Sequence, residues 1–169
     1  GRGTHSSGRA EVEQMLLKLG SIYDMTAGEL IASSSFDVAS GSTFNMTNGT
    51  FQAPTANIAA RFSMGGGHTI VDKFIFDSGG YGEHTEGTAN VQDMMLHAGA
   101  FYALSAGRLI ASDNFDVEAG ATFNMTNGFF SSPLATIAAK YIFGGGVSNI
   151  NQFNVSGAGR ASQSEGIQN

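Results

Sequence analysis

Apolar and polar residues follow a short pattern that recurs along the whole chain: an apolar residue, any residue, an apolar residue, two further residues and a glycine. Two apolar side chains separated by one residue are typical of a β-strand with one buried face, and the glycine that follows favours a tight turn. The pattern begins at Met15, Tyr23, Phe36, Phe44, Phe62, Phe74, Met94, Tyr102, Phe115, Phe123, Tyr141 and Phe153, and only the last copy ends in alanine. The chain is therefore predicted to consist of many short strands.

A step of 21 residues separates successive copies of each strand. It relates Met15 to Phe36, Tyr23 to Phe44 and Leu30 to Phe51. A coil of about 21 residues with three short strands is typical of one rung of a triangular β-solenoid. The sequence therefore predicts an all-β fold, a parallel β-solenoid. In the third rung PTANIAA and GGG read as insertions, with Phe62 opening the first strand and Phe74 the second.

A longer repeat of 79 residues contains these rungs. Residues 28–67 and 107–146 align without gaps and are identical at 25 of 40 positions. The chain divides into a first repeat unit, a second unit and the start of a third, at residues 1–79, 80–158 and 159–169. Three rungs per unit predict about six rungs in all. A pair of antiparallel β-sandwich domains is the alternative, but it does not require the 21-residue step.

Parallel rungs bury one side of each strand, which assigns a direction to every side chain. Ten apolar residues are expected to form an inward core ladder: Phe36, Val38, Phe44, Met46, Phe62, Phe115, Val117, Phe123, Met125 and Tyr141. Four glycines are expected in turns, several with positive φ: Gly41, Gly49, Gly120 and Gly128. A short helix over Glu11–Leu19 is an open alternative, because its apolar residues also have helical spacing.

Composition limits the function classes. Charged residues make up 13% of the chain, about half the usual share. The net charge is −6 without a basic cluster, so no nucleic-acid partner is expected. Cysteine is absent, which excludes disulfides and thiolate metal sites. No apolar run approaches the ~20 residues that span a bilayer, so no membrane insertion is expected.

No candidate catalytic group emerges from the sequence. Asp37 and Asp116 are equivalent in the two units and would lie three rungs, or about 14 Å, apart. Carboxylate pairs act at about 5–10 Å. His5 and His84 share a repeat position, but without further ligands nearby they do not predict a metal site. We therefore expect no enzyme, no catalytic residue, no cofactor and no metal.

Asparagine and threonine recur on the outward positions and in the turns. Four asparagines match the N-glycosylation acceptor pattern: Asn45, Asn48, Asn124 and Asn154. The alternative is that these residues line the outer face and turns of the solenoid, where side-chain ladders form. Both interpretations remain open.

The segments FDVASGSTFNMTNG at residues 36–49 and FDVEAGATFNMTNG at residues 115–128 resemble the Gly-rich β-solenoid repeats of bacterial and archaeal surface proteins. Autotransporter passengers and filamentous-haemagglutinin-type adhesins are examples. The resemblance implies a parallel β-helix outside the cell or on its surface, used for adhesion, matrix or sheath. The calcium-binding repeat of RTX proteins is not matched, because Gly65–Thr69 lacks its aspartate.

We expect a structural building block of an extracellular filament, sheath or adhesin stalk. Few charges favour association, and both 1–10 and 159–169 continue the repeat rather than capping it. The expected partners are copies of the same chain or further repeats of a longer chain, packed end to end and laterally. The alternative is a non-catalytic module that binds carbohydrate or a surface through exposed asparagine, threonine and aromatic side chains.

Overall fold

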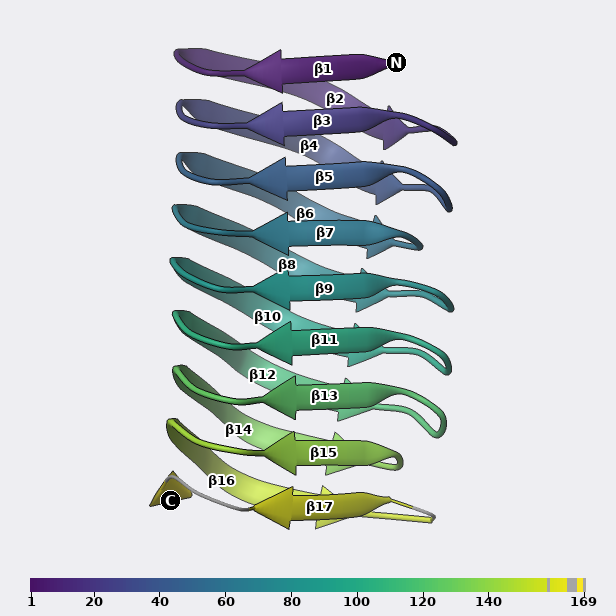
Figure 1. The fold of residues 1–169 in the computed structure, drawn as a ribbon, viewed down its shortest axis with the longest axis vertical. Helices are drawn as coiled ribbons and strands as arrows, with labels where there is room; N and C mark the ends of the chain where they lie inside the picture. Colours follow the sequence, from purple (N-terminus) through teal and green to yellow (C-terminus); the bar gives the residue numbers. More distant parts are fainter. Residues whose placement is uncertain (158, 164–166, 169) are drawn as a thin grey trace.

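The chain coils into a parallel β-solenoid of about eight turns (Figure 1). The structure is a computed structural model that describes residues 1–157, 159–163, 167 and 168, and these contain no helix. Each rung consists of one short strand followed by one long strand. The short strands are β1 (Arg2–His5), β3 (Ile22–Met25), β5 (Thr43–Met46), β7 (Arg61–Met64), β9 (Tyr81–His84), β11 (Phe101–Leu104), β13 (Thr122–Met125), β15 (Lys140–Phe143) and β17 (Arg160–Gln163). The long strands are β2 (Arg9–Leu17), β4 (Glu29–Val38), β6 (Thr50–Ile58), β8 (His68–Phe76), β10 (Thr88–Leu96), β12 (Arg108–Val117), β14 (Phe129–Ile137) and β16 (Val147–Val155), and the two-residue β18 (Ile167–Gln168) extends their sheet.

The short and long strands form two separate sheets of nine strands each. Strand pairing is parallel throughout the described residues, with each strand bonded to its counterparts in the rungs before and after it. The prediction of an all-β parallel solenoid is confirmed. The antiparallel β-sandwich alternative is wrong, because sandwich strands pair antiparallel.

Each 79-residue unit contains four rungs rather than the three expected. The short strands of the first unit begin at Arg2, Ile22, Thr43 and Arg61, and the next unit begins its first short strand at Tyr81. Successive steps are therefore 20, 21, 18 and 20 residues. The extra residue in the second rung lies in β4, which has ten residues where its neighbours have nine. The 18-residue step arises because Ala59 and Ala60 replace a four-residue turn.

The missed rung has small side chains at its first inward position. Ala56 pairs with Phe36 on one side and Phe74 on the other, and Ile58 is buried two residues later. At Ala56 the recurring pattern would begin with alanine rather than a large apolar residue, and no glycine follows it after Ile58. This segment therefore does not match the pattern, and its residues read as an insertion. Phe62 and Phe74 consequently exchange places: Phe62 stacks on Phe44 in the short-strand sheet, and Phe74 belongs to the long-strand sheet.

The expected triangular cross-section is wrong, because two of the three predicted strands merge into one. Leu30 and Ala32 lie in the same strand, β4, as Phe36 and Val38. The register shifts between Ile31 and Phe36, where the long strand bends. Similar shifts occur at Val12/Gln14, Val91/Asp93 and Ile110/Asn114. Such irregularities bend a strand while its neighbours keep their pairing.

The core is a continuous set of apolar columns between the two sheets. Phe36, Phe44 and Phe51 pack with ring centroids 4.6 to 5.4 Å apart, the usual range for aromatic pairs. The helix considered for Glu11–Leu19 is not present, because β2 covers Arg9–Leu17. Its Val12 and Met15 pack against the core while Leu16 points outward.

Candidate interaction surfaces

The residues singled out by their pattern occupy the core and the turns. All ten side chains of the core ladder are at most 1% exposed. The four turn glycines have φ between 73° and 96°. The core-ladder side chains are therefore not available to a partner. Any binding site must come from the outward side chains, the turns or the two ends.

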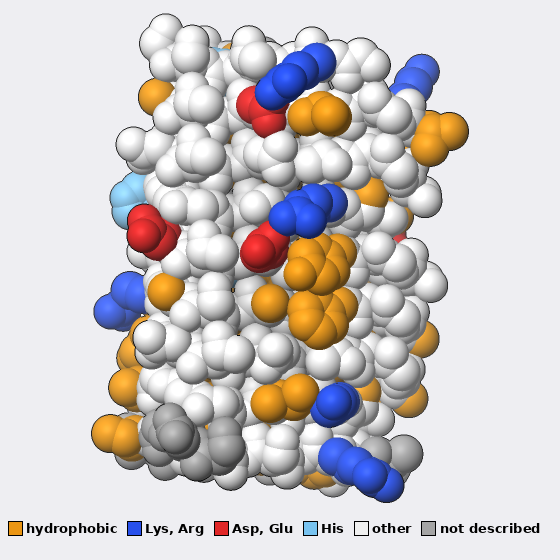
Figure 2. All heavy atoms as spheres, viewed as in Figure 1, with side chains coloured by type: hydrophobic (Ala, Val, Ile, Leu, Met, Phe, Trp, Pro, Cys, Tyr) orange, Lys and Arg blue, Asp and Glu red, His pale blue; other side chains and the backbone are white. Residues whose placement is uncertain are grey.

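The outward side of the short strands is the first candidate surface, called here the short-strand face. Tyr81 and Phe101, on neighbouring strands, stack there with centroids 5.2 Å apart and planes 8° from parallel. Tyr81 is 38% exposed. The Arg61 guanidinium lies 5.5 Å from the Tyr81 centroid and forms an ion pair with Glu83. Hydrophobic side chains gather midway along this face beside charged ones (Figure 2).

The aromatic stack is a departure from the internal repeat. The position of Tyr81 is occupied by Arg2 in the first unit, and that of Phe101 by Ile22. Because both side chains point outward, neither substitution improves the core. Sequence reasoning missed this pair, since the strand pattern weighs only inward residues.

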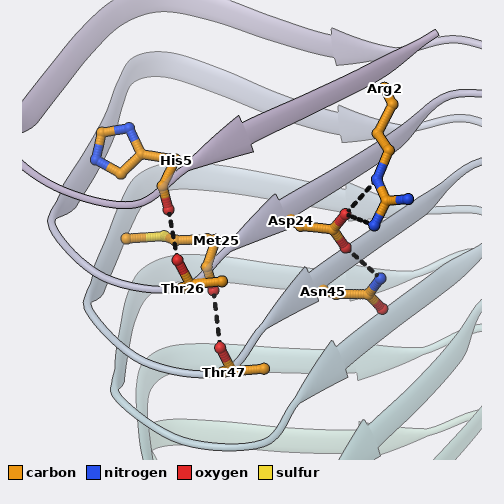
Figure 3. A network of polar contacts seen from close by, with 7 residues as sticks. All are labelled: Arg2, His5, Asp24, Met25, Thr26, Asn45 and Thr47. Carbon is orange, nitrogen blue, oxygen red and sulfur yellow. Dashed lines mark hydrogen bonds and ion pairs between the residues drawn. The ribbon is translucent and has the colours of Figure 1, made fainter.

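Polar side chains on the short-strand face also form contacts between neighbouring rungs. The Asn45 amide donates a 2.8 Å hydrogen bond to Asp24, which also accepts one from Arg2 (Figure 3). The hydrogen bond from Asn45 and the nearby Arg2 charge hold the pKa of Asp24 below its ordinary value. Asp24 and Asn45 face outward from adjacent strands, and each contact ties two rungs together.

The outward side of the long strands, called the long-strand face, carries similar contacts between rungs and a larger number of acidic side chains. Asn57 donates to Asp37 at 2.7 Å, and Asn114 donates to Asp93 at 2.8 Å. Partial burial raises the pKa of Asp116, with further contributions from the charges of Asp93 and Glu118. Asp37 and Asp116 are four rungs apart, not three, or about 19 Å at normal strand spacing. They are too distant to act as a carboxylate pair.

The two end rungs expose core positions. Val12 and Met15 in β2 are only partly buried, whereas the equivalent Ala32 and Phe36 of the next rung are fully buried. At the other end Phe153 is partly buried and Val155 is 48% exposed. The predicted start of a third unit at residues 159–169 includes positions 164–166 and 169, which lie outside the described residues.

The histidines do not combine into a metal site. His84 is buried, with Nδ1 3.2 Å from the Tyr102 hydroxyl and Nε2 3.3 Å from the Gly87 carbonyl. His5 occupies the same position in the exposed first rung. His97 lies in a turn near Glu118 and Asp77. Within the described ranges, no group of three or more His, Asp or Glu side chains could hold a metal ion.

The sequon asparagines differ in their surroundings. Asn48 lies exposed in a turn, where its side-chain oxygen accepts a hydrogen bond from the Gly49 amide. Asn154 is exposed near the end of β16. Asn45 and Asn124 are half-buried in short strands, and a glycan on Asn45 would replace its bond to Asp24. The two exposed sites, Asn48 and Asn154, are therefore the more accessible.

Comparison with models of protein families, with curated protein sequences and with solved structures gave no match. The fold is therefore defined by the strand pairing described above, and no function is carried over from a relative. The described part of the chain contains no helix that is long and apolar enough to span a membrane.

Proposed function

We propose that the chain is a structural building block of an extracellular filament, sheath or adhesin stalk, which self-associates by end-to-end and lateral packing. The observation that carries this proposal is the regular parallel stacking of the rungs, in which each strand pairs with its counterparts in the rungs before and after it. Val12 and Met15 at one end, and Phe153 and Val155 at the other, occupy positions that are buried in the interior rungs. A further rung placed there would continue both the core and the backbone ladder.

Such a contact has two sources of stability. Burial of apolar area contributes roughly 25 cal/mol per Å², and the strands of the end rung offer backbone N–H and C=O groups to a parallel neighbour. The added rung belongs either to another copy or to further repeats of a longer chain. Repeat proteins of this kind contact only their neighbours along the axis, so rungs can be added without changing the existing ones.

The test is light scattering on the purified chain at micromolar concentration. We expect assemblies larger than a monomer, and we expect the double substitution V12K/M15K to reduce them, because it places charges on an inward end position. Leu16→Lys is the matched control, since Leu16 lies on the same strand but is 54% exposed. A stable monodisperse monomer for the unmodified chain would overturn the proposal.

The remaining expectations fit this role. We propose a location outside the cell or at its surface, as the resemblance to autotransporter and haemagglutinin-type repeats implies, and no catalytic activity. The low charged fraction of 13% supports association over solubility as single molecules. A load-bearing element needs a continuous core rather than a reactive cleft.

A carbohydrate-binding role is the second candidate, supported by the exposed Tyr81–Phe101 stack. Aromatic side chains offer a large apolar surface at low conformational entropy, and Asn124 and Thr122 lie on the adjacent strand. Binding to a panel of immobilised glycans tests this role. The double substitution Y81A/F101A should abolish binding. Glycan binding by a chain that stays as discrete, unassembled particles would favour this candidate over the structural one.

A further inference from the structure

The two faces of the solenoid carry opposite net charge. The strands of the short-strand face contain four basic and two acidic residues: Arg2, Arg61, Lys140 and Arg160 against Asp24 and Glu83. The long strands contain three basic and eight acidic residues: Arg9, Lys73 and Arg108 against Glu11, Glu13, Glu29, Asp37, Asp72, Asp93, Asp113 and Asp116. Two copies can therefore approach with faces of opposite charge. This favours association of the short-strand face of one copy with the long-strand face of another.

One column on each face has the same organisation. The cationic column of the short-strand face runs over five successive rungs: Arg61, Tyr81, Phe101, Thr122 and Lys140. The acidic column of the long-strand face also runs over five: Asp37, Asn57, Ile75, Met95 and Asp116. In each column the two end residues carry charges of the same sign, and apolar side chains lie near the centre.

The end-to-end lengths of the two columns are equal. Arg61 and Lys140 are separated by one 79-residue repeat, as are Asp37 and Asp116. One repeat is four rungs, so each pair spans about 19 Å. A single placement of one copy on another thus brings both cations to both carboxylates. The internal repeat supplies this match, because both pairs occupy equivalent positions in the two units.

The surfaces between the charges also fit. A hollow on the long-strand face is lined by Lys73, Ile75, Asp93, Met95 and Asp116. The stacked rings of Tyr81 and Phe101 stand on the short-strand face, which belongs to the other sheet. Aromatic and arginine side chains dominate many interfaces when they enter such a hollow.

We propose that the cationic column of one copy packs on the acidic column of a second copy, with the two solenoid axes antiparallel. The antiparallel direction is preferred because it places apolar side chains on apolar ones and polar side chains on polar ones, while each cation still meets a carboxylate. It places Arg61 on Asp116, Tyr81 on Met95, Phe101 on Ile75, Thr122 on Asn57 and Lys140 on Asp37. The parallel direction would instead place Tyr81 on Asn57 and Thr122 on Met95. Because each copy keeps one face of each kind, the contact continues from copy to copy.

This inference rests on the proposed structural role and specifies its lateral contact. It is tested separately from end-to-end stacking by working in the end-blocked V12K/M15K variant. The chain has no cysteine, so single cysteines report contacts directly, since a disulfide requires Cβ atoms about 3.5–4.5 Å apart. Thr122→Cys is mixed with Asn57→Cys, or with Met95→Cys, under mild oxidation.

The antiparallel contact predicts that Thr122→Cys forms a mixed disulfide with Asn57→Cys at least about fivefold more than with Met95→Cys, which lies two rungs, or about 10 Å, away. Lys18→Cys, in an exposed turn, gives the level produced by random collision. Preferential linkage to Met95→Cys would overturn the antiparallel direction. Homodimers in excess of the mixed product, or linkage no greater than the Lys18→Cys level, would overturn the contact itself.

Charge reversal gives a second test. Lys140→Glu should weaken lateral association about tenfold, as expected when a favourable ion pair becomes a repulsive one, and Asp37→Lys in the partner should restore it. Lys18→Glu changes the net charge equally but lies off both columns, and should leave association unchanged. Equal weakening by both substitutions, or no rescue, would contradict the proposed pairing. Filaments that form without lateral linkage would refute this inference while leaving end-to-end stacking intact.

Discussion

At the residue scale, the glycines after the interior short strands are constrained by the preceding rung. Gly49 has φ of 96°, and a Cβ there would lie 2.6 Å from the Gly28 carbonyl oxygen. Gly20 has φ of 74°, but no atom lies within 4 Å of its Cβ position. The two positions thus separate backbone strain from steric overlap between rungs.

We predict that Gly20→Ala lowers the free energy of unfolding by about 1–2 kcal/mol, the cost of a left-handed conformation for an L-residue. Gly49→Ala should lower it by about 1–3 kcal/mol more, because the methyl group also meets backbone of the adjacent rung. Chemical denaturation of both variants measures the difference. Equal losses would show that the close approach of the two turns has no energetic consequence.

His84 is a buried titratable group within the apolar column. Burial lowers its pKa from 6.5 to about 4, so the folded chain favours the neutral ring. The unfolded chain binds a proton below pH 6.5, and the stability provided by neutral His84 is therefore lost as the pH falls from about 6.5 toward 4. The expected loss is about 3 kcal/mol over that interval.

The double substitution H84M/Y102F should remove this part of the pH dependence. Methionine occupies the same column at Met46 and Met64, and phenylalanine occupies the Tyr102 position at Phe44 and Phe123. Y102F alone is the control, because it keeps the histidine. Unfolding free energies of the three chains between pH 7 and pH 4 provide the measurement. Parallel curves for the double variant and the unmodified chain would contradict the assignment to His84.

At the element scale, each rung is a unit that contacts only its two neighbours. Removing one rung in phase should therefore leave a shorter solenoid with the same contacts. Deletion of residues 61–80 brings Phe44 next to Gly82 and Met46 next to His84, where Phe62 and Met64 now lie. The new neighbours differ in side chain, but the strand register is kept, because β6 and β10, which would become adjacent, both have nine residues.

We predict that this deletion keeps a cooperative thermal transition and a β-sheet circular dichroism spectrum. Deletion of residues 61–70 removes half a rung and brings a short strand into the place of a long one, so it should abolish both. If the two deletions were equally disruptive, stability would depend on contacts beyond neighbouring rungs.

The strand direction and the turns could be predicted from the sequence, because the inward Phe and Met columns and the glycines recur at fixed steps. The number of rungs could not, since the strand at Ala56 and Ile58 lacks both the aromatic residue and the glycine that mark the others. The merging of two strands into β4 is accompanied by a register shift between Ile31 and Phe36, which apolar spacing does not specify. The columns of outward residues could not be predicted either, because identifying them requires the strand register between all rungs. An error of one rung would assign the wrong residues to a column.

At the scale of the whole molecule, the solenoid is a rod with exposed core positions at its ends and oppositely charged faces along its sides. Each feature offers a different direction of growth. End-to-end stacking lengthens the rod through apolar columns and backbone hydrogen bonds, and depends little on salt. Lateral packing depends on exposed charges, whose interactions are screened beyond about 10 Å at 0.1 M salt.

Electron microscopy of the purified chain at low salt shows directly whether the chain is a self-associating structural element. We expect filaments with an axial repeat of about 4.8 Å, the spacing between parallel strands, and side-by-side bundles that separate as salt is added. Discrete particles about eight rungs high, at every concentration and salt condition, would contradict it.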